Sequence, residues 1–169
     1  IDNPADRALA HAIAAEVLRR TPDLDDLIDS ATKQRLPDDA KARMVLRIAL
    51  VQALILGTPP HAAVATALPL VEAGPRRLVH GVLGTLLRQE AKLRSVPMLL
   101  PGVEMRWQEA WGSAMVGDAC AALAAPPPVD LTLRDATETP RWVEELSATS
   151  LAPGHIRLPG GTAITELPG

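Results

Sequence analysis

The sequence predicts a mainly α-helical protein, with a helical bundle followed by a small α/β subdomain. Hydrophobic residues make up 47% of the 169 residues but aromatic residues only 2%, with neither Phe nor Tyr. A core built from Ala, Leu, Val and Ile favours closely packed helices. Apolar residues recur with helical spacing before residue 125, and they alternate with period two after Pro126-Pro127-Pro128. The change of period at the prolines therefore predicts two parts with different secondary structure.

Helices are expected over most of the first part. Leu9, Ile13 and Val17 lie on one helical face, and Pro22 then interrupts the pattern because proline disfavours helix in the residue before it. Gly57 follows a long apolar segment at the place where glycine commonly ends a helix. The expected helices cover residues 6–20, 23–30, 37–56, 61–73, 76–94 and 104–125, with 96–103 as a linker.

Two of these helices carry residues that bear on packing. In 76–94, Gly81 and Gly84 are expected to permit the close approach of another helix, because neither has a side chain. In 23–30, four carboxylates crowd one short helix and are interpreted as a solvated face: Asp23, Asp25, Asp26 and Asp29.

Period-two alternation predicts strands after the triple proline. Residues 129–133 are expected to form the first strand, and 140–148 a short amphipathic helix. Residues 155–158 and 163–167 alternate again on either side of Pro159-Gly160-Gly161, so we expect them to pair as a hairpin. A unit of this size cannot bury a core alone, so it is expected to pack on the helical part or on sequence that follows it.

Charge is distributed unevenly along the chain. The formal net charge is −3, which gives no global argument for binding nucleic acid. Residues 33–94, however, hold ten Lys or Arg against four Asp or Glu, whereas residues from 101 onward hold four against nine. A basic segment in an acidic protein is a modest indication of an anionic partner.

Cysteine usage and hydropathy indicate the compartment. The single cysteine, Cys120, excludes an intrachain disulfide and fits a reducing cytoplasm. No apolar run reaches about 18 residues without a charge or a proline, and no signal peptide is visible, so we expect a cytoplasmic protein without a membrane span. Because the chain begins at Ile1 rather than at a methionine, we expect a fragment of a longer protein.

No catalytic residue, metal site or cofactor site is expected in this chain. Cys120 lies in an Ala-rich helix near Asp118, whereas a reactive thiol normally needs a cationic setting. No strand leads into a glycine-rich loop and a helix, so a cofactor cradle is missing. The four histidines share no metal-ligand spacing. The chain by itself is therefore not expected to be an enzyme.

Arginine and lysine supply the candidate binding residues. Arg43 and Arg47 lie four positions apart on a largely apolar helix, where a basic side chain needs an anionic partner or water. Arg76 and Arg77 are expected at a helix N-terminus, where two guanidiniums and free backbone N–H groups suit a phosphate. Without Phe or Tyr, contacts to RNA should be to phosphates and shape. The candidate RNA-binding residues are Arg43, Arg47, Arg76, Arg77, Arg88 and Lys92.

Four sequence motifs resemble a known family. They are Asp6-Arg7-Ala8-Leu9-Ala10-His11, the R-x-x-x-R helix of residues 43–56, the corner Pro59-Pro60-His61-Ala62-Ala63-Val64, and the final helix from Leu78-Val79-His80-Gly81-Val82-Leu83 to residue 88. Together they resemble the NusB-like RNA-binding domain at the front of RsmB/Fmu-type 16S ribosomal RNA cytosine-C5 methyltransferases. The resemblance implies a NusB-like helical bundle over residues 1–100, a linker helix over 101–125 and a small α/β subdomain over 126–169.

The same resemblance implies a function that depends on more than this chain. The chain would position 16S ribosomal RNA for a downstream catalytic domain of its own protein, which would bind S-adenosylmethionine. Two alternatives remain open. One is a non-enzymatic NusB-like module of transcription antitermination or ribosome assembly, and the other is a helical protein–protein interaction domain.

Overall fold

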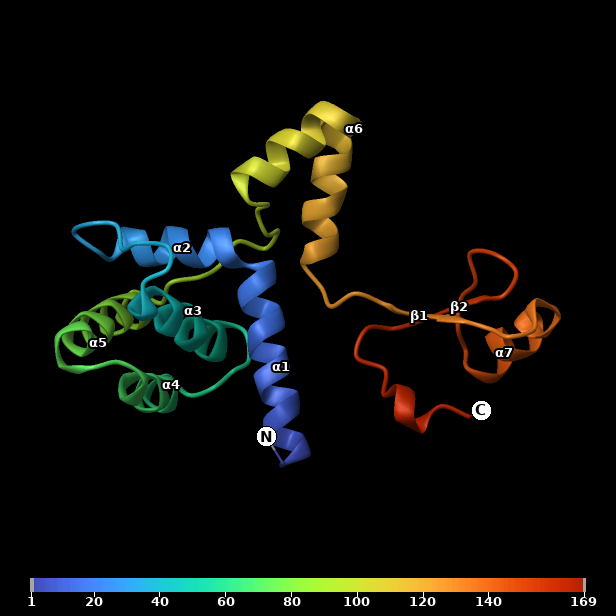
Figure 1. Ribbon diagram of the computed structural model, residues 1–169, viewed down its shortest axis with the longest axis horizontal. Helices are drawn as coiled ribbons and strands as arrows, with labels where there is room; N and C mark the ends of the chain where they lie inside the picture. Colours follow the sequence, from blue (N-terminus) through green and yellow to red (C-terminus); the bar gives the residue numbers. More distant parts are fainter. Residues whose placement is uncertain (1, 169) are drawn as a thin grey trace. The chain divides into compact units, whose positions relative to one another are not determined.

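A computed structural model describes residues 2–168 and confirms a mainly α protein that carries a small two-stranded sheet in the described part (Figure 1). The chain divides into two compact units, with the division after Cys120. The expected division into 1–100, 101–125 and 126–169 stays a prediction.

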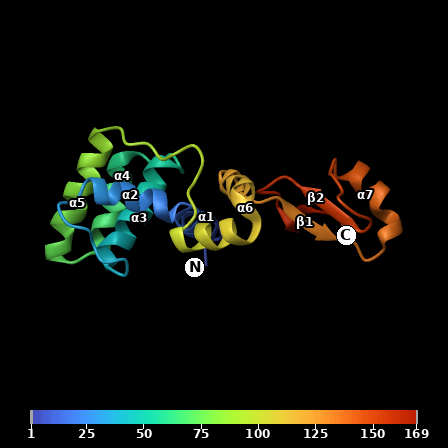
Figure 2. The same ribbon diagram turned by 90° about the horizontal axis from the view of Figure 1, so that it is seen from above.

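The first unit is organised around α3. The helices packed on α3 or next to it along the chain are α1 (Pro4–Arg19), α2 (Thr21–Ser30), α4 (Pro60–Ala67) and α5 (Ala73–Arg88), and α3 itself spans Lys41–Leu54. The central α3 is contacted by α1, α2, α4 and α5, which Figure 2 shows gathered around it. Leu46, Ala49, Leu50 and Val51 of α3 are fully buried in this aliphatic core. The core therefore confirms that Ala, Leu, Val and Ile suffice to close the bundle.

The ends of the helices follow from local hydrogen bonds. At the start of α1, the side chain of Asn3 accepts a hydrogen bond from the backbone N–H of Ala5 at 2.9 Å, which caps the helix. α5 ends at Arg88, although a helix was expected to residue 94. Glu90 adopts a positive φ of 49°, and the N–H of Ala91 donates to the carbonyl of Leu86 at 3.0 Å. This hydrogen bond closes the last turn of α5, and the chain then leaves the direction of the helix axis.

The expected start of the long helix at residue 37 is also wrong. The backbone N–H of Ala40 donates to the carbonyl of Pro37 at 3.1 Å, which makes a turn, and α3 begins only at Lys41. Residues 31–40 are therefore a loop between α2 and α3.

α6 (Pro101–Leu123) is bent at Gly112, whose φ of 83° and ψ of 169° are open essentially to glycine alone. The rings of Trp107 and Trp111 lie edge to face, with centroids 5.6 Å apart, in the last turn before the bend. Most side chains of α6 are exposed, Trp111 among them.

The second unit contains β1 (Val129–Thr132), α7 (Thr139–Glu145) and β2 (His155–Leu158). β1 pairs with β2 in antiparallel register, with Leu131 opposite Ile156. Arg157 of β2 donates through Nε and Nη2 to the two carboxylate oxygens of Asp130, at 2.7 and 2.8 Å. These bonds come first among the causes that lower the pKa of Asp130 to about 2.

The expected hairpin between 155–158 and 163–167 is wrong. Residues Ile164–Glu166 form a 3₁₀ turn, and β2 takes β1 as its partner. The other edge of β2 is occupied by a bridge between Arg157 and Thr149. The turn after β2 passes so close to the triple proline that a Cβ atom on Gly160 would lie 2.8 Å from the carbonyl oxygens of Pro126 and Pro127, which only glycine avoids.

Candidate nucleic-acid interface

Arg43 and Arg47, two of the predicted RNA-binding residues, are buried and paired within the protein. The Arg43 side chain is 0% exposed, and its Nη2 lies 2.5 Å from Asp29 Oδ1 while Nη1 lies 3.0 Å from Asp25 Oδ1. Arg47 donates through Nε and Nη2 to the two oxygens of Asp25, at 2.8 and 2.7 Å. The expectation that these two guanidiniums meet RNA is therefore corrected: their anionic partners are carboxylates of α2.

The same pairs correct the interpretation of α2 as a solvated acidic face. Burial by itself raises the pKa of the Asp25 carboxyl, but hydrogen bonds from Arg47 and Arg43 outweigh it, so its pKa lies below the ordinary value. Asp23 is also buried and accepts a hydrogen bond from the backbone N–H of Met98 at 3.1 Å. Asp26 alone among the four helix carboxylates is mostly exposed.

A sequence signal for this network exists. Asp25 and Asp29 are four residues apart on α2, and Arg43 and Arg47 are four residues apart on α3. Residues four apart lie on one face of a helix, so each helix can present its two charges together to the other. Arg43 extends the network to the following loop, because its Nε and Nη2 also donate to the carbonyl of Leu36, at 3.1 and 2.8 Å.

The other four predicted residues, Arg76, Arg77, Arg88 and Lys92, remain at the surface. All four are exposed, and none forms an ion pair with any residue in the range 2–168. The backbone cradle expected beside them is not available, because α5 begins at Ala73 and the N–H of Arg76 already donates to the carbonyl of Glu72 at 2.9 Å. Their side chains alone can therefore meet an anion.

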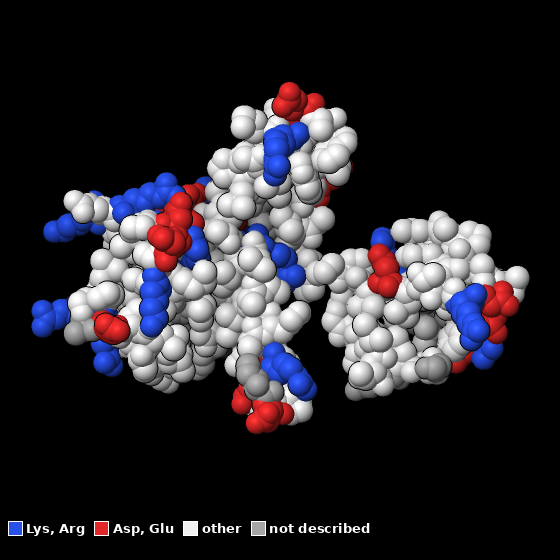
Figure 3. Space-filling view, in the orientation of Figure 1, with Lys and Arg blue, Asp and Glu red and all other residues white. Residues whose placement is uncertain are grey.

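Sequence reasoning missed Lys33 and Arg35, which lie in the loop 31–40 beside α5. Lys33 is exposed, and Arg35 is 66% exposed even though it pairs with Asp38 at 2.8 Å. In Figure 3, Lys and Arg atoms project from the part of the first unit that holds α2, the loop after it and α5. The signal for these residues is the local charge excess of 33–94, of which they form part.

The expected Gly81 and Gly84 helix contact is also corrected. A methyl group on Gly81 would meet no heavy atom within 4 Å, and one on Gly84 would meet only the guanidinium of Arg88, at 3.0 Å. Both glycines therefore lie at an open surface of α5, between Arg77 and Arg88.

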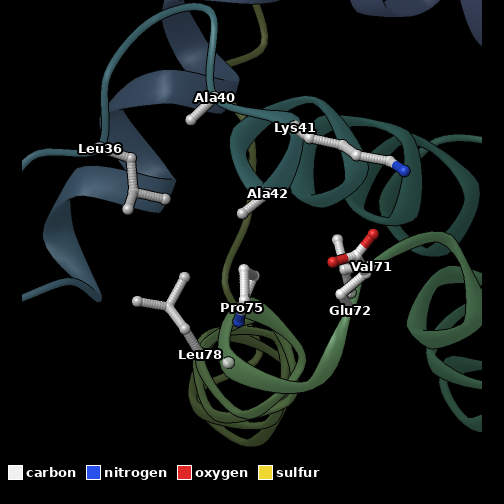
Figure 4. Close-up of a pocket in the computed structure, with 9 residues that line it drawn as sticks. Leu36, Ala40, Lys41, Ala42, Val71, Glu72, Pro75 and Leu78 are labelled. Atoms are coloured by element: carbon white, nitrogen blue, oxygen red, sulfur yellow. The ribbon is translucent and has the colours of Figure 1, made fainter.

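A hollow of about 580 Å³ lies where α3 and α5 begin (Figure 4). Leu36, Ala42, Pro75 and Leu78 surround it with carbon atoms, and Lys41 and Glu72 supply its charged groups. Because one cation and one carboxylate offset each other, this hollow does not favour an anionic ligand.

Within residues 2–168 no group of three or more His, Cys, Asp or Glu side chains could hold a metal ion. None of the helices described there combines the length and the apolar character needed to cross a bilayer. Cys120 is partly buried.

A family model described as the NusB family matches residues 2–88, which is about half of the chain. The chain belongs to the NusB family. The match runs from the cap of α1 to the last residue of α5, so the NusB region ends where the exposed cations of α5 end. Among the curated proteins nothing matches the chain, and no solved structure matches it either. Membership of the NusB family indicates a helical RNA-binding domain, and the match does not extend to the residues after 88.

Proposed function

We propose that this chain is the RNA-binding region of a ribosomal RNA cytosine-C5 methyltransferase, and that it positions 16S ribosomal RNA for a catalytic domain elsewhere in the same protein. The observation that carries the RNA-binding part is a set of exposed cations on α5 and just after it that form no ion pair with the side chains described in residues 2–168: Arg76, Arg77, Arg88 and Lys92. An unpaired guanidinium at the surface is well suited to a phosphate, because its fork of donors matches the phosphate oxygens.

The spacing of these cations along α5 suits an extended anion. Arg77 and Arg88 are eleven residues apart, which corresponds to about three turns and about 16 Å along the helix axis, and places both on nearly the same face. An isolated phosphate would reach one of them, whereas a sugar–phosphate backbone reaches both. The contact is electrostatic and follows the shape of the RNA, since no aromatic residue lies on α5.

A fourfold variant tests the RNA-binding part. Arg76→Gln, Arg77→Gln, Arg88→Gln and Lys92→Gln together should weaken binding to a 16S ribosomal RNA fragment at least tenfold at 0.1 M salt and flatten the dependence of log K on log salt, by roughly 0.7–0.9 for each phosphate contact removed. The matched control replaces exposed cations away from α5, with Arg7→Gln and Arg106→Gln, and should leave affinity unchanged. Equal loss in both variants would contradict a site on α5.

The methyltransferase context is supported by the resemblance of the sequence and by the compact unit with a two-stranded sheet that follows the helical unit. S-adenosylmethionine would bind to the catalytic domain, and in the described part no strand runs through a glycine-rich loop into a helix that could hold it. We expect the gene to encode a glycine-rich S-adenosylmethionine loop and two cysteine motifs after residue 169. A gene that encodes neither would favour a non-enzymatic NusB-like module.

A further inference from the structure

A second hollow lies between the α2–α3 loop and α5, and we call it the loop hollow. It measures about 770 Å³, within the range of small-ligand sites. Its walls are residues 31–37 of the loop on one side and Leu78, Gly81, Val82 and Thr85 of α5 on the other. Because the loop residues come from between two helices and the floor from a third, the hollow exists only in the folded bundle.

The lining combines three kinds of group. Leu36, Leu78 and Val82 provide aliphatic carbon, and Val82 is buried beneath the surface. Gln34 and Thr85 offer amide and hydroxyl groups, and Lys33 places an exposed positive charge at the loop. The guanidinium of Arg35 is offset by Asp38 at 2.8 Å and by Asp29 at 3.6 Å. A bare phosphate would leave the aliphatic surface unused, and an uncharged apolar ligand would leave Lys33 unused.

The loop wall is held in place from inside the protein. The carbonyl of Leu36 accepts two hydrogen bonds from the buried Arg43, which is itself fixed by Asp25 and Asp29. The side chain of Thr32 adds a hydrogen bond to the carbonyl of Asp29 at 3.3 Å. A wall fixed in this way loses less conformational entropy when a ligand binds.

Gly81 lies in the α5 side of the hollow, where no side chain covers the helix backbone. Glycine weakens the interior of a helix, so an exposed glycine in the middle of α5 lowers the helix propensity of that segment. No packing contact accounts for it, because a methyl group there would meet nothing within 4 Å. A ligand that approaches the backbone of α5 closely would use this open space.

We propose that the loop hollow takes one unstacked nucleotide of a bound RNA. The base would lie against Leu36, Leu78 and Gly81, with its polar edge toward Gln34 and Thr85 and its phosphate toward Lys33. Sequence-specific recognition of RNA commonly uses such splayed-out bases. The inference rests on the proposed RNA binding and adds to it, because phosphate contacts along α5 require no base at all.

The test compares two oligomers of equal charge. Hexauridylate and a six-residue oligomer with the same sugar–phosphate backbone but no bases are titrated into the full chain, with binding followed by fluorescence anisotropy and by backbone amide NMR. Hexauridylate should bind about tenfold more tightly than the abasic oligomer. It should also shift the amide signals of Gly81 and Thr85, which the abasic oligomer should move less.

Gly81→Leu fills the hollow and provides the decisive variant. It should abolish the preference for hexauridylate, leave the affinity for the abasic oligomer unchanged, and give an equal or higher melting temperature, since leucine favours helix more than glycine does. Gly117→Leu is the matched control, because Gly117 is an exposed glycine of α6 with nothing within 4 Å. It should keep the full preference.

Each other outcome overturns the inference. Equal affinity of the wild-type chain for both oligomers, or a preference that survives Gly81→Leu, would mean that no base enters the hollow, while the phosphate contacts of α5 would stand. Failure to bind either oligomer and the 16S ribosomal RNA fragment would overturn the proposed function as well.

Discussion

Replacing Arg43 with methionine should destabilise the first unit strongly, although Arg43 was expected at a nucleic-acid surface. The variant removes the 2.5 Å pairing with Asp29, the 3.0 Å contact with Asp25 and two hydrogen bonds to the carbonyl of Leu36. Removing one partner of a buried ion pair costs about 3–5 kcal/mol, because the other charge stays behind without compensation. Asp25 keeps its two bonds to Arg47 and Asp29 is one-third exposed, so the lower end, about 3 kcal/mol, is expected.

The assay is urea unfolding at pH 7 followed by far-UV circular dichroism, which reports mainly on the helical first unit. In a thermal scan followed by the same signal, the melting temperature should fall by about 10 °C. Arg43→Lys keeps the charge but cannot donate to two carboxylates and a carbonyl at once. Its free energy of unfolding should therefore lie between those of the wild type and Arg43→Met. Arg88→Met replaces an exposed arginine and should change the free energy of unfolding by less than about 0.5 kcal/mol.

The pH dependence supplies an independent check. The pKa of Asp25 is lowered in the folded state, so its contribution to stability is complete above the ordinary aspartate pKa of about 3.9 and is lost as the pH falls through the lowered value. Wild-type stability should therefore fall below about pH 4, and Arg43→Met should reduce this dependence. A loss smaller than about 1 kcal/mol at pH 7 would refute the reasoning, because it would mean that Arg43 reaches solvent.

Two further predictions concern the other elements. The carboxyl of Asp130 should titrate near pH 2 in an NMR titration. Arg157→Gln should return its pKa toward about 3.9, because the hydrogen bonds from Arg157 contribute most to the shift. An unchanged pKa in this variant would place the cause elsewhere. Gly112→Ala cannot keep the φ of 83° without strain of roughly 1–3 kcal/mol. We therefore expect α6 to straighten, which circular dichroism would record as a gain in helicity. Gly117→Ala should only add about 0.5–1 kcal/mol to the free energy of unfolding. Identical effects of these two substitutions would show that the bend does not depend on Gly112.

Helical segments could be located from the sequence, because the spacing that marks them is local. The apolar stripe with Val17 and the glycine at 57 indicate α1 and the end of α3, and the structure places both elements there. The end of α5 could not be located, since it depends on Glu90 adopting a positive φ, which glycine does far more readily. Strand pairing failed for a different reason: whether β2 pairs with β1 or with residues 163–167 depends on which edge of β2 is already occupied.

The candidate site divides in the same way. Four of the six predicted cations are exposed, and their type and local excess were visible in the sequence. Arg43 and Arg47 were misplaced because the residues that neutralise them lie on another helix, and the side chains of Lys33 and Arg35 became candidates only once the loop was seen beside α5.

The amino-acid order by itself determined a Phe- and Tyr-free helical bundle of the NusB family, with an excess of positive charge in its middle segment. Tertiary structure decided which of those charges are available to a partner. The neighbours of a helix decide which of its side chains are buried. Because α2 packs against α3, Arg43 and Arg47 are buried, whereas the arginines of α5 remain exposed to solvent.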